Sequence, residues 1–236
     1  MRLFFLSLIF SFNAYSQSSG TVTYHFYIPL AVDDIKDEEA KKFISNIKEL
    51  ANSQEFTLKF NKTRSSFEYL DELNYDSERD RKVNDIAKAA YTSDDTYIDF
   101  FNKIMIKIMS DGTLIKSTIE SEKWEIKNET KTIGTYLCYK AVTHESFINR
   151  KGEPKTREII CWFAPVLPYS FGPKTFNGLP GLILELTEDN KTFTASKIEL
   201  SDKEMDINLP KGKKTSKEEY EKKLKESLGA IVKSRN

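Results

Sequence analysis

Apolar and polar side chains alternate along many short segments of the chain, which is the pattern of strands in a sheet. In residues 21–28, TVTYHFYI, the apolar or aromatic residues Val22, Tyr24, Phe26 and Ile28 occupy every second position. Successive side chains of a strand point to opposite faces of the sheet. The segment therefore predicts a first strand with one buried face.

Helical spacing of apolar residues occurs in two segments. Residues 37–52, DEEAKKFISNIKELAN, repeat apolar residues at helical spacing and begin with acidic ones, which suit the first turn of a helix. Residues 77–91 predict a second helix with a thinner apolar face. Between these helices, EFTLKFN and RSSFEYL predict two strands that are joined at the turn Asn61-Lys62.

After Asp94 the chain becomes a series of short extended segments. They are TYIDF, NKIMIKIM, TLIKSTI, KWEIKNE, TYLCYKAVTHE, REIICWFAP, GLILELTE and TFTASKIEL. Residues 110–112, Ser-Asp-Gly, are a turn signal, residues 145–156 predict an exposed loop, and residues 216–233 predict a highly charged helix. Because brief turns join successive strands in antiparallel fashion, the pattern predicts an α+β fold, with a large curved antiparallel β-sheet, one N-terminal helix packed on it and a charged C-terminal helix.

The first residues have the pattern of a secretory signal peptide. Arg2 precedes the apolar run 3–12, and the small residues Ala14 and Ser16 stand at −3 and −1 relative to Gln17. The run is shorter than the ~20 residues of a membrane-spanning helix, and we predict no transmembrane segment elsewhere. The expected division is a signal peptide 1–16, a single β-rich domain 17–213 and a charged helical tail 214–236.

The charge of the chain is balanced. It has 36 basic and 36 acidic residues, and removal of Arg2 with the predicted signal leaves 35 basic residues and a balance of −1. No net field therefore favours nucleic acid or an anionic membrane as a partner. Aromatic residues make up 12% of the chain, which suits a sheet and argues against disorder.

Cys138 and Cys161 are the two cysteines of the chain. In an oxidising compartment a pair is first interpreted as a disulfide, and two buried thiols are the alternative. If the flanking segments form a hairpin, the cysteines face each other only when the pairing centres between Asn149 and Arg150. A tight turn at residues 151–152 places them about four residues out of register, too far apart for a bridge. Both possibilities stay open.

The segment FNGLPGLILEL, residues 176–186, combines two glycines and a proline with an apolar run. A phosphate-binding loop needs Lys-Ser/Thr after its glycines, but Gly181 is followed by Leu-Ile-Leu. A nucleophile elbow needs a serine between glycines, and residues 178–186 contain none. The pattern instead predicts a type II turn with Pro180 at its second position and Gly181, at positive φ, at its third. The predicted structural turn comprises Gly178, Leu179, Pro180, Gly181, Leu182 and Ile183.

In the strand that follows this turn, the side chains are expected to alternate between the two faces. Leu182, Leu184 and Leu186 would lie on one face, and Ile183 and Glu185 on the other. The motif is therefore interpreted as architectural, and damage to it is expected to cause a folding defect.

These residues resemble a known family. The hexapeptide 178–183 is the one that names the GLPGLI family, a group of exported bacterial proteins that occur mainly in the Bacteroidetes and have no established activity. Residues 123–141 are similar to its Trp-x-Ile and Gly-Tyr-x-Cys-x-Lys-Ala elements, with Thr135 inserted. Residues 161–173 are similar to its Ala-Trp-Tyr-Thr and Ile-Pro-x-x-x-Gly-Pro elements, with Cys161 where alanine is usual. The resemblance implies export to the periplasm or cell surface of a Gram-negative bacterium, and it implies no cysteine pairing.

Candidate chemistry in the sequence is sparse. His25 and His144 are far apart along the chain, and His144 is about 20 Å from Cys138 along an extended strand. No His-Glu-x-x-His, Cys-x-x-Cys or Gly-x-Ser-x-Gly motif occurs. Glu185, inside an apolar run, is either a desolvated acid or an outward residue of a half-exposed strand. We predict no catalytic residue, metal ion or cofactor.

Two functional hypotheses follow. The first is an exported non-catalytic β-rich protein that binds an apolar ligand, a peptide, a lipid or an envelope partner such as an outer-membrane protein. Trp162, Phe163, Tyr169 and Phe171 are candidates to line its groove, although aromatic residues of strands more often belong to a core. The second is a periplasmic hydrolase with a non-standard active site. A cleft that gathers His25, His144 or Glu185 beside a serine or cysteine would favour the enzyme.

Overall fold

The structure is a computed structural model that describes residues 18–70, 77–91, 94–119, 122–148 and 153–223. The predicted signal peptide 1–16 and residues 224–236 of the predicted tail lie outside the described residues. Helix α1 spans Glu38–Asn52 and α2 spans Glu78–Tyr91. The strands are β1 Ser19–Tyr27, β2 Glu55–Asn61, β3 Arg64–Leu70, β4 Asp95–Asp99, β5 Ile104–Ile108, β6 Leu114–Thr118, β7 Glu125–Ile133, β8 Tyr136–Ile148, β9 Pro154–Ala164, β10 Leu182–Glu188, β11 Lys191–Ser201 and β12 Lys214–Thr215.

The strands form one open sheet, so the prediction of a large sheet is confirmed. Its twelve strands are ordered β12-β6-β5-β4-β3-β2-β1-β11-β10-β9-β8-β7. Neighbouring strands pair antiparallel except β12, which pairs parallel with β6 and makes the sheet mixed. The pairing of β1 with both β2 and β11 places the first strand in the middle of the sheet. Strands β2–β6 lie on one side of it and β7–β11 on the other.

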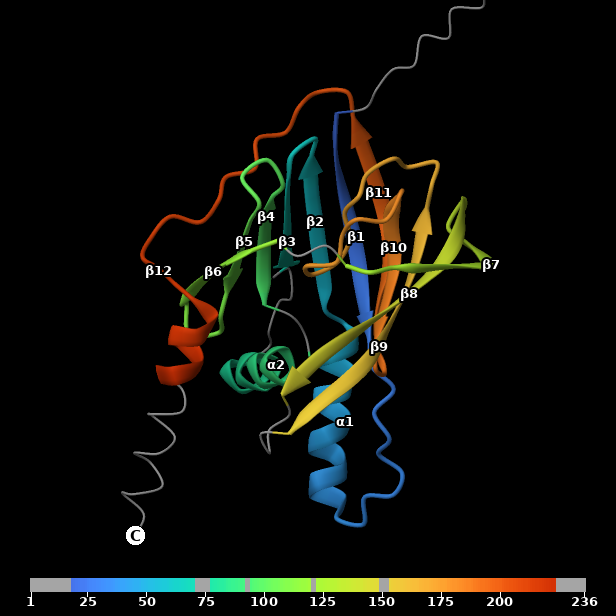
Figure 1. The fold of residues 1–236 in the computed structure, drawn as a ribbon. Coiled ribbons are helices and arrows are strands. Elements are labelled where there is room, and N and C mark those ends of the chain that lie inside the picture. Colours follow the sequence, from blue (N-terminus) through green and yellow to red (C-terminus); the bar gives the residue numbers. More distant parts are fainter. Residues whose placement is uncertain (1–17, 71–76, 92–93, 120–121, 149–152, 224–236) are drawn as a thin grey trace, which may run out of the picture.

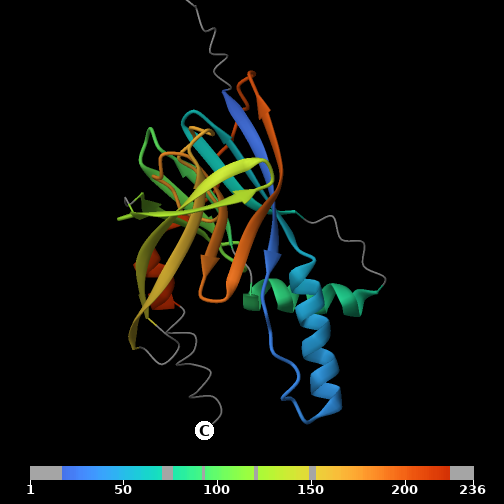
Figure 2. The same ribbon diagram turned by 90° about the vertical axis from the view of Figure 1, so that its right-hand side faces the viewer.

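The sheet curls so that its two arms approach each other. Figures 1 and 2 show the long β8–β9 hairpin sweeping across toward the side of the molecule that carries β6 and the C-terminal helix, residues 217–223. Right-handed twist accumulates over many strands and favours such curling. Residues of β5 and β8, far apart in strand order, thereby line one cavity.

The inner face of this curl, here called the concave face, carries the core. The pairing register places Leu58 opposite Phe67 and Val22, and Leu186 opposite Phe193, along this face. Its aromatic rings contact one another and are at most 1% exposed: Tyr24, Phe26, Phe56, Phe67 and Phe193. The connection between β9 and β10 folds onto the same face, where Phe171 contacts the rings of Phe60 and Phe100.

The helices differ from the prediction of one N-terminal helix packed on the sheet. Three helical segments are described, and α1 and α2 lie together beyond the ends of β1 and β2 (Figure 1). Helix α1 begins where its spacing predicted, because the Asp37 side chain accepts a hydrogen bond from the Ala40 amide at 2.8 Å. Ile47 and Ala51 are its buried residues. Among the described residues, no helix is long and apolar enough to cross a bilayer.

Candidate functional site

The GLPGLI segment is a tight connection, but its glycines work differently from the prediction. The predicted positive φ at Gly181 is wrong, since the left-handed residue is Gly178, with φ 88°. A Cβ on Gly181 would lie 2.4 Å from the Ala164 carbonyl oxygen. Gly181 is thus required by a close backbone approach. The Tyr24 hydroxyl donates to the Ile183 carbonyl at 2.5 Å and ties the segment to β1.

The expected alternation after this turn is interrupted by a bulge. The β9–β10 register shifts between Ile183 and Glu185, and Leu182, Ile183, Leu184 and Leu186 are all 0% exposed. Glu185 lies opposite Trp162, on the outer face of the sheet. Its carboxylate accepts hydrogen bonds from Lys131 at 2.5 Å and from Thr194 at 3.2 Å. Of the two alternatives, the structure agrees with the outward residue, which here is partly buried and ion-paired.

Of the two possibilities for the cysteines, the structure has the buried thiols and no disulfide, because Cys138 and Cys161 are both buried and both free. The residue opposite Cys161 is Ala141, three residues along β8 from Cys138. Paired residues share a face and odd steps along a strand change face, so the two thiols point to opposite faces of the sheet. Burial raises the pKa of Cys138 to about 11 and that of Cys161 above its usual value.

The four candidate aromatic residues do not line a common groove. Phe163 and Phe171 are 2% and 5% exposed and belong to the core. Tyr169 packs its ring on Phe60. Trp162 lies on the opposite face of the sheet, where the Lys131 ammonium is 4.5 Å from the centroid of its ring.

The two histidines also stay apart. His25 contacts Glu55 at 3.0 Å with a side chain that is 57% exposed, while His144 lies opposite Glu158 at the far arm of the sheet. The register places His25 and Glu185 on either side of Thr194, on the open outer face. No group of three or more His, Cys, Asp or Glu side chains in the described part of the chain could hold a metal ion.

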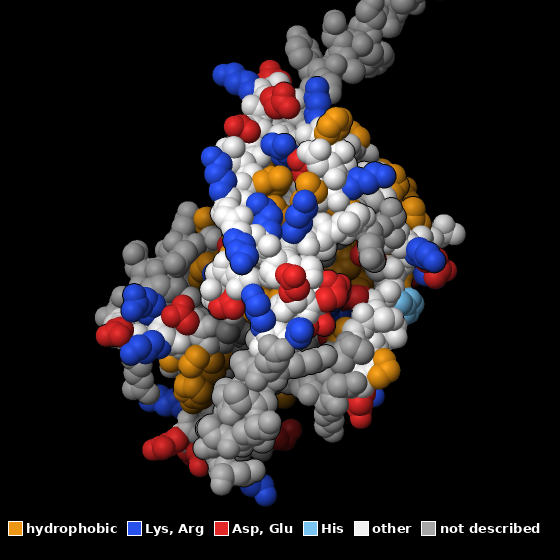
Figure 3. All heavy atoms as spheres, turned by 60° about the vertical axis from the view of Figure 1, so that its left-hand side comes forward, with side chains coloured by type: hydrophobic (Ala, Val, Ile, Leu, Met, Phe, Trp, Pro, Cys, Tyr) orange, Lys and Arg blue, Asp and Glu red, His pale blue; other side chains and the backbone are white. Residues whose placement is uncertain are grey.

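A cavity on the concave face was not predicted. It has a volume of about 490 Å³ and lies between β5, β6, the end of β8, residues 175–177 and the C-terminal helix. Figure 3 brings forward the side of the molecule that carries β6 and the C-terminal helix. On this side, acidic side chains gather beside a hollow with hydrophobic side chains behind it. Its apolar lining comprises Met105, Met109, Ile115, Ile119 and Tyr220. The volume is within the range of roughly 300–1,000 Å³ that is typical of small-molecule sites.

An adjoining hollow of about 130 Å³ forms a charged base. The two hollows share Asp94, Lys107, Glu145 and Thr175 as lining residues. The base adds further charged and polar groups: Thr96, Arg157, Lys174 and Glu188.

Glu188 is the most buried charge of this base, with 3% of its side chain exposed. Lys174 and Arg157 both contact its carboxylate, and the Arg157 Nε also donates to Glu145 at 2.8 Å. Burial alone would raise the pKa of Glu188, but the Lys174 and Arg157 cations outweigh burial and hold this pKa below its usual value. The network joins β8, β9, β10 and the connection that precedes the GLPGLI segment.

Lys174 occupies a strained backbone position in this network. Its φ is 58°, which only a few per cent of non-glycine residues adopt. Both ends of the residue are held, because its carbonyl accepts from the Thr96 hydroxyl at 2.8 Å and its ammonium contacts Glu188. Strain that the surroundings maintain is concentrated at functional sites.

Lys107 differs from the other two cations of the base. The ion pairs of the base engage Arg157 and Lys174 but not Lys107. Burial lowers the pKa of Lys107, and Asp94 and Glu145 partly offset that effect. Burial likewise raises the pKa of Asp94, partly offset by Lys107. The base therefore brings the Lys107 ammonium close to the carboxylates of Asp94 and Glu145.

One sequence signal for this site existed. Met105, Lys107 and Met109 occupy alternate positions of a strand, so the Lys107 cation shares a face with two apolar side chains. The opposite wall could not be identified in this way, because Glu145 stands at the boundary between the predicted strand 135–145 and the predicted loop 145–156.

A third hollow lies on the other face of the C-terminal helix. It has a volume of about 590 Å³ and is lined largely by exposed residues, including Lys213, Lys222 and Lys223. Exposed lysines place a ligand poorly, because the lysine ammonium is a point charge on a flexible stem. The cavity with the charged base is therefore the better candidate site.

Comparison with known proteins gives a short family match and a fold likeness. Residues 145–185 match a family model described as "Protein of unknown function (Porph_ging)", and this segment supplies Glu145, Arg157, Lys174 and Thr175 to the charged base. No curated protein matches the chain.

Two solved structures of PNGF-II are similar to the chain in fold. The structure in space group C2 has a TM-score of 0.51 at 14% identity and covers 87% of this chain and 32% of its own. The structure in space group P21 has a TM-score of 0.52 at 15% identity and covers 87% of this chain and 33% of its own. The chain thus spans about a third of the length of the solved chains that it matches.

Proposed function

We propose that the chain is an exported, non-catalytic ligand-binding protein of the GLPGLI family, and that its cavity binds a small ligand with an apolar part and a charged part. The observation that carries the proposal is the two-part lining of one cavity of about 490 Å³, with Met105, Met109 and Ile115 along one wall and Lys107 at its base. Ligand sites combine such an apolar lining with a few polar groups that fix orientation.

Export to the periplasm or cell surface is part of the same proposal. It is supported by the N-terminal pattern of residues 1–16 and by the resemblance of residues 123–186 to an exported family. A peptide or lipid of the envelope is then the natural ligand. The hydrolase alternative gains no site from the geometry, since His25, His144 and Glu185 belong to the outer face or the far arm of the sheet, away from this cavity.

Fluorescence titration with 8-anilinonaphthalene-1-sulfonate tests the proposal, because the dye combines apolar rings with one anionic group. We expect saturable binding to the purified chain. Met109→Glu should weaken dye binding by about tenfold or more, because it places a negative charge on the apolar wall. Tenfold corresponds to about 1.4 kcal/mol.

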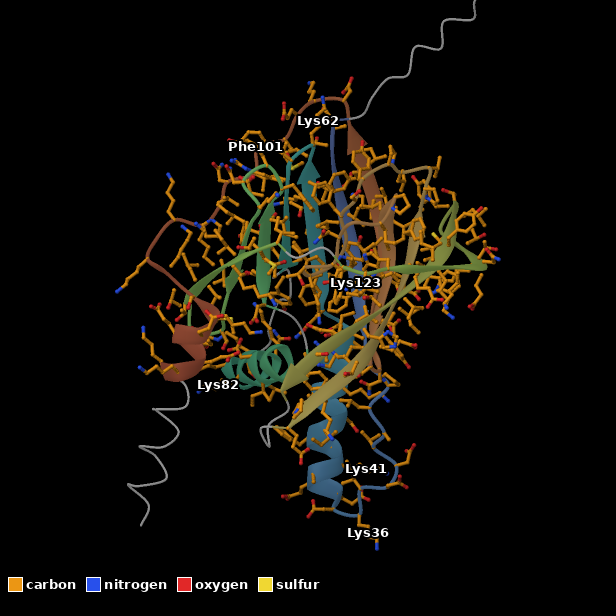
Figure 4. The ribbon with its side chains drawn as sticks, in the orientation of Figure 1. Lys36, Lys41, Lys62, Lys82, Phe101 and Lys123 are labelled. Carbon is orange, nitrogen blue, oxygen red and sulfur yellow. The ribbon has the colours of Figure 1, made fainter. Side chains whose placement is uncertain are left out.

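Phe101→Ser is the matched control, since Phe101 is 83% exposed at the turn between β4 and β5 (Figure 4) and does not line the cavity. Equal affinity of the Met109→Glu variant and the wild type would show that the dye binds elsewhere. So would loss of binding in the Phe101→Ser control.

A further inference from the structure

The charged base of the cavity presents both signs of charge to one small space. Lys107 supplies an ammonium, which can only donate hydrogen bonds, and Asp94 and Glu145 supply carboxylates, which accept them when ionised. All three line both hollows. A ligand group at the base therefore meets a donor and two acceptors together.

Glu145, Arg157, Lys174 and Glu188 form ion pairs with one another within the protein. Arg157 contacts Glu145 and Glu188, and Lys174 contacts Glu188. This network belongs to the same charged base as Lys107. Lys107 is the cation of the charged base that takes part in none of these ion pairs.

A ligand with a single charge fits this base poorly. A carboxylate placed on Lys107 alone would approach Asp94 and Glu145, which repel it. An ammonium placed on the carboxylates alone would approach Lys107. Because burial of an unpaired charge is costly, the ligand that fits best carries an ammonium and a carboxylate a few ångströms apart.

The apolar lining of the cavity determines which further groups the ligand carries. Met105 and Met109 lie on the same face of the strand as Lys107, and Ile115 lies opposite Lys107 on β6. Methionine side chains adapt to apolar groups of irregular shape. The wall beside the charged base therefore suits an apolar side chain rather than a second polar group.

We propose that the cavity binds an apolar amino acid or short peptide with both of its ends free, whose carboxylate contacts Lys107 and whose ammonium contacts Asp94 and Glu145. The inference rests on the proposed ligand-binding function and deepens it by naming the ligand class. Charge-assisted hydrogen bonds at both ends give the specificity, and the side chains lie along Met105, Met109 and Ile115.

Calorimetric titration with leucyl-leucine tests the inference. The matched probes are its N-acetyl form, its C-terminal amide and the form blocked at both ends. The free dipeptide should bind, and each single block should weaken binding by tenfold or more.

Lys107→Gln should weaken binding of the free dipeptide by tenfold or more and change the affinity for the C-terminal amide by less than threefold. Asp94→Asn should likewise weaken binding of the free dipeptide by tenfold or more, and it should change the affinity for the N-acetyl form by less than threefold. Lys62→Gln is the control for removal of a lysine charge, because Lys62 lies exposed at the β2–β3 turn, away from the cavity (Figure 4).

The outcomes separate this inference from the function on which it rests. If the doubly blocked dipeptide binds as tightly as the free one, or if Lys107→Gln weakens the free dipeptide and the amide equally, the two-ended recognition is wrong. If the dipeptide fails to bind while the dye binds and responds to Met109→Glu, the ligand class is wrong and the binding function stands. If neither binds, both proposals fail.

Discussion

Lys174 holds its ammonium against the buried carboxylate of Glu188 from a left-handed backbone. The two residues join the connection before the GLPGLI segment to the end of β10. A positive φ at a residue with a Cβ costs roughly 1–2 kcal/mol, so the ion pair and the hydrogen bond from Thr96 to the Lys174 carbonyl hold the chain in a conformation that it would otherwise leave. Charge and backbone strain are thus coupled at the floor of the candidate site.

This coupling predicts different costs for two truncations of Lys174. Lys174→Ala removes one of the two cations on Glu188 and should cost about 3 kcal/mol, the lower end for breaking a buried pair, because Arg157 remains. Lys174→Gly removes the same cation but relieves the strain, so it should cost about 1 kcal/mol less than Lys174→Ala. Urea unfolding of both variants measures the difference. Equal stabilities would mean that the positive φ carries no strain.

Acid should destabilise the protein through Glu188. Its pKa is lower in the folded than in the unfolded state, where a glutamate has a pKa of about 4.3. Below that pH the unfolded chain binds the proton first, so the stability from this group, fully present above pH 4.3, is lost as the pH falls through the folded pKa. We expect the free energy of unfolding to fall more steeply below about pH 4.3 in the wild type than in Glu188→Gln. Parallel curves for the two proteins would contradict this role.

The two glycines of the GLPGLI segment should differ in their sensitivity to alanine. Gly178 has positive φ, and a Cβ there has nothing within 4 Å, so Gly178→Ala should cost about 1–2 kcal/mol from backbone strain alone. Gly181→Ala places a Cβ 2.4 Å from a backbone oxygen that cannot rotate away, and should cost about 3 kcal/mol or more. Denaturant unfolding of both variants tests the order. A Gly181→Ala variant that is as stable as wild type yet fails to bind ligand would make the segment a site rather than a connection.

The strands and helices could be predicted because their signals are local. The period of two in residues 21–28 and the helical spacing in residues 37–52 depend only on neighbouring residues, and both elements form where expected. Gly181 shows the limit of such reasoning. Its sequence context fits a type II turn, but the constraint comes from Ala164, which reaches it through the folded sheet.

The candidate site could not be predicted because it depends on how the sheet curls. Lys107 and Glu145 belong to strands at opposite arms of the sheet, and no pattern in either strand states the curvature that brings them together. The alternation in residues 182–186 fails for a related reason. One extra residue in a bulge changes which face the following side chains occupy.

The last prediction concerns the two thiols. Cys161 lies opposite Ala141, so a bridge to Cys138 would require β8 to slip by three residues past β9. An odd slip turns every side chain of a strand to the other face, which would expel the buried Ala141 and Thr143 from the core. The chain recovered from an oxidising compartment should therefore keep its full reduced mass. Both thiols should resist a thiol reagent at pH 8 while the protein is folded, since burial raises both pKa values, and both should react in urea. A mass lower by about 2 Da, or the absence of reactive thiol in urea, would show that the register described for β8 and β9 is wrong.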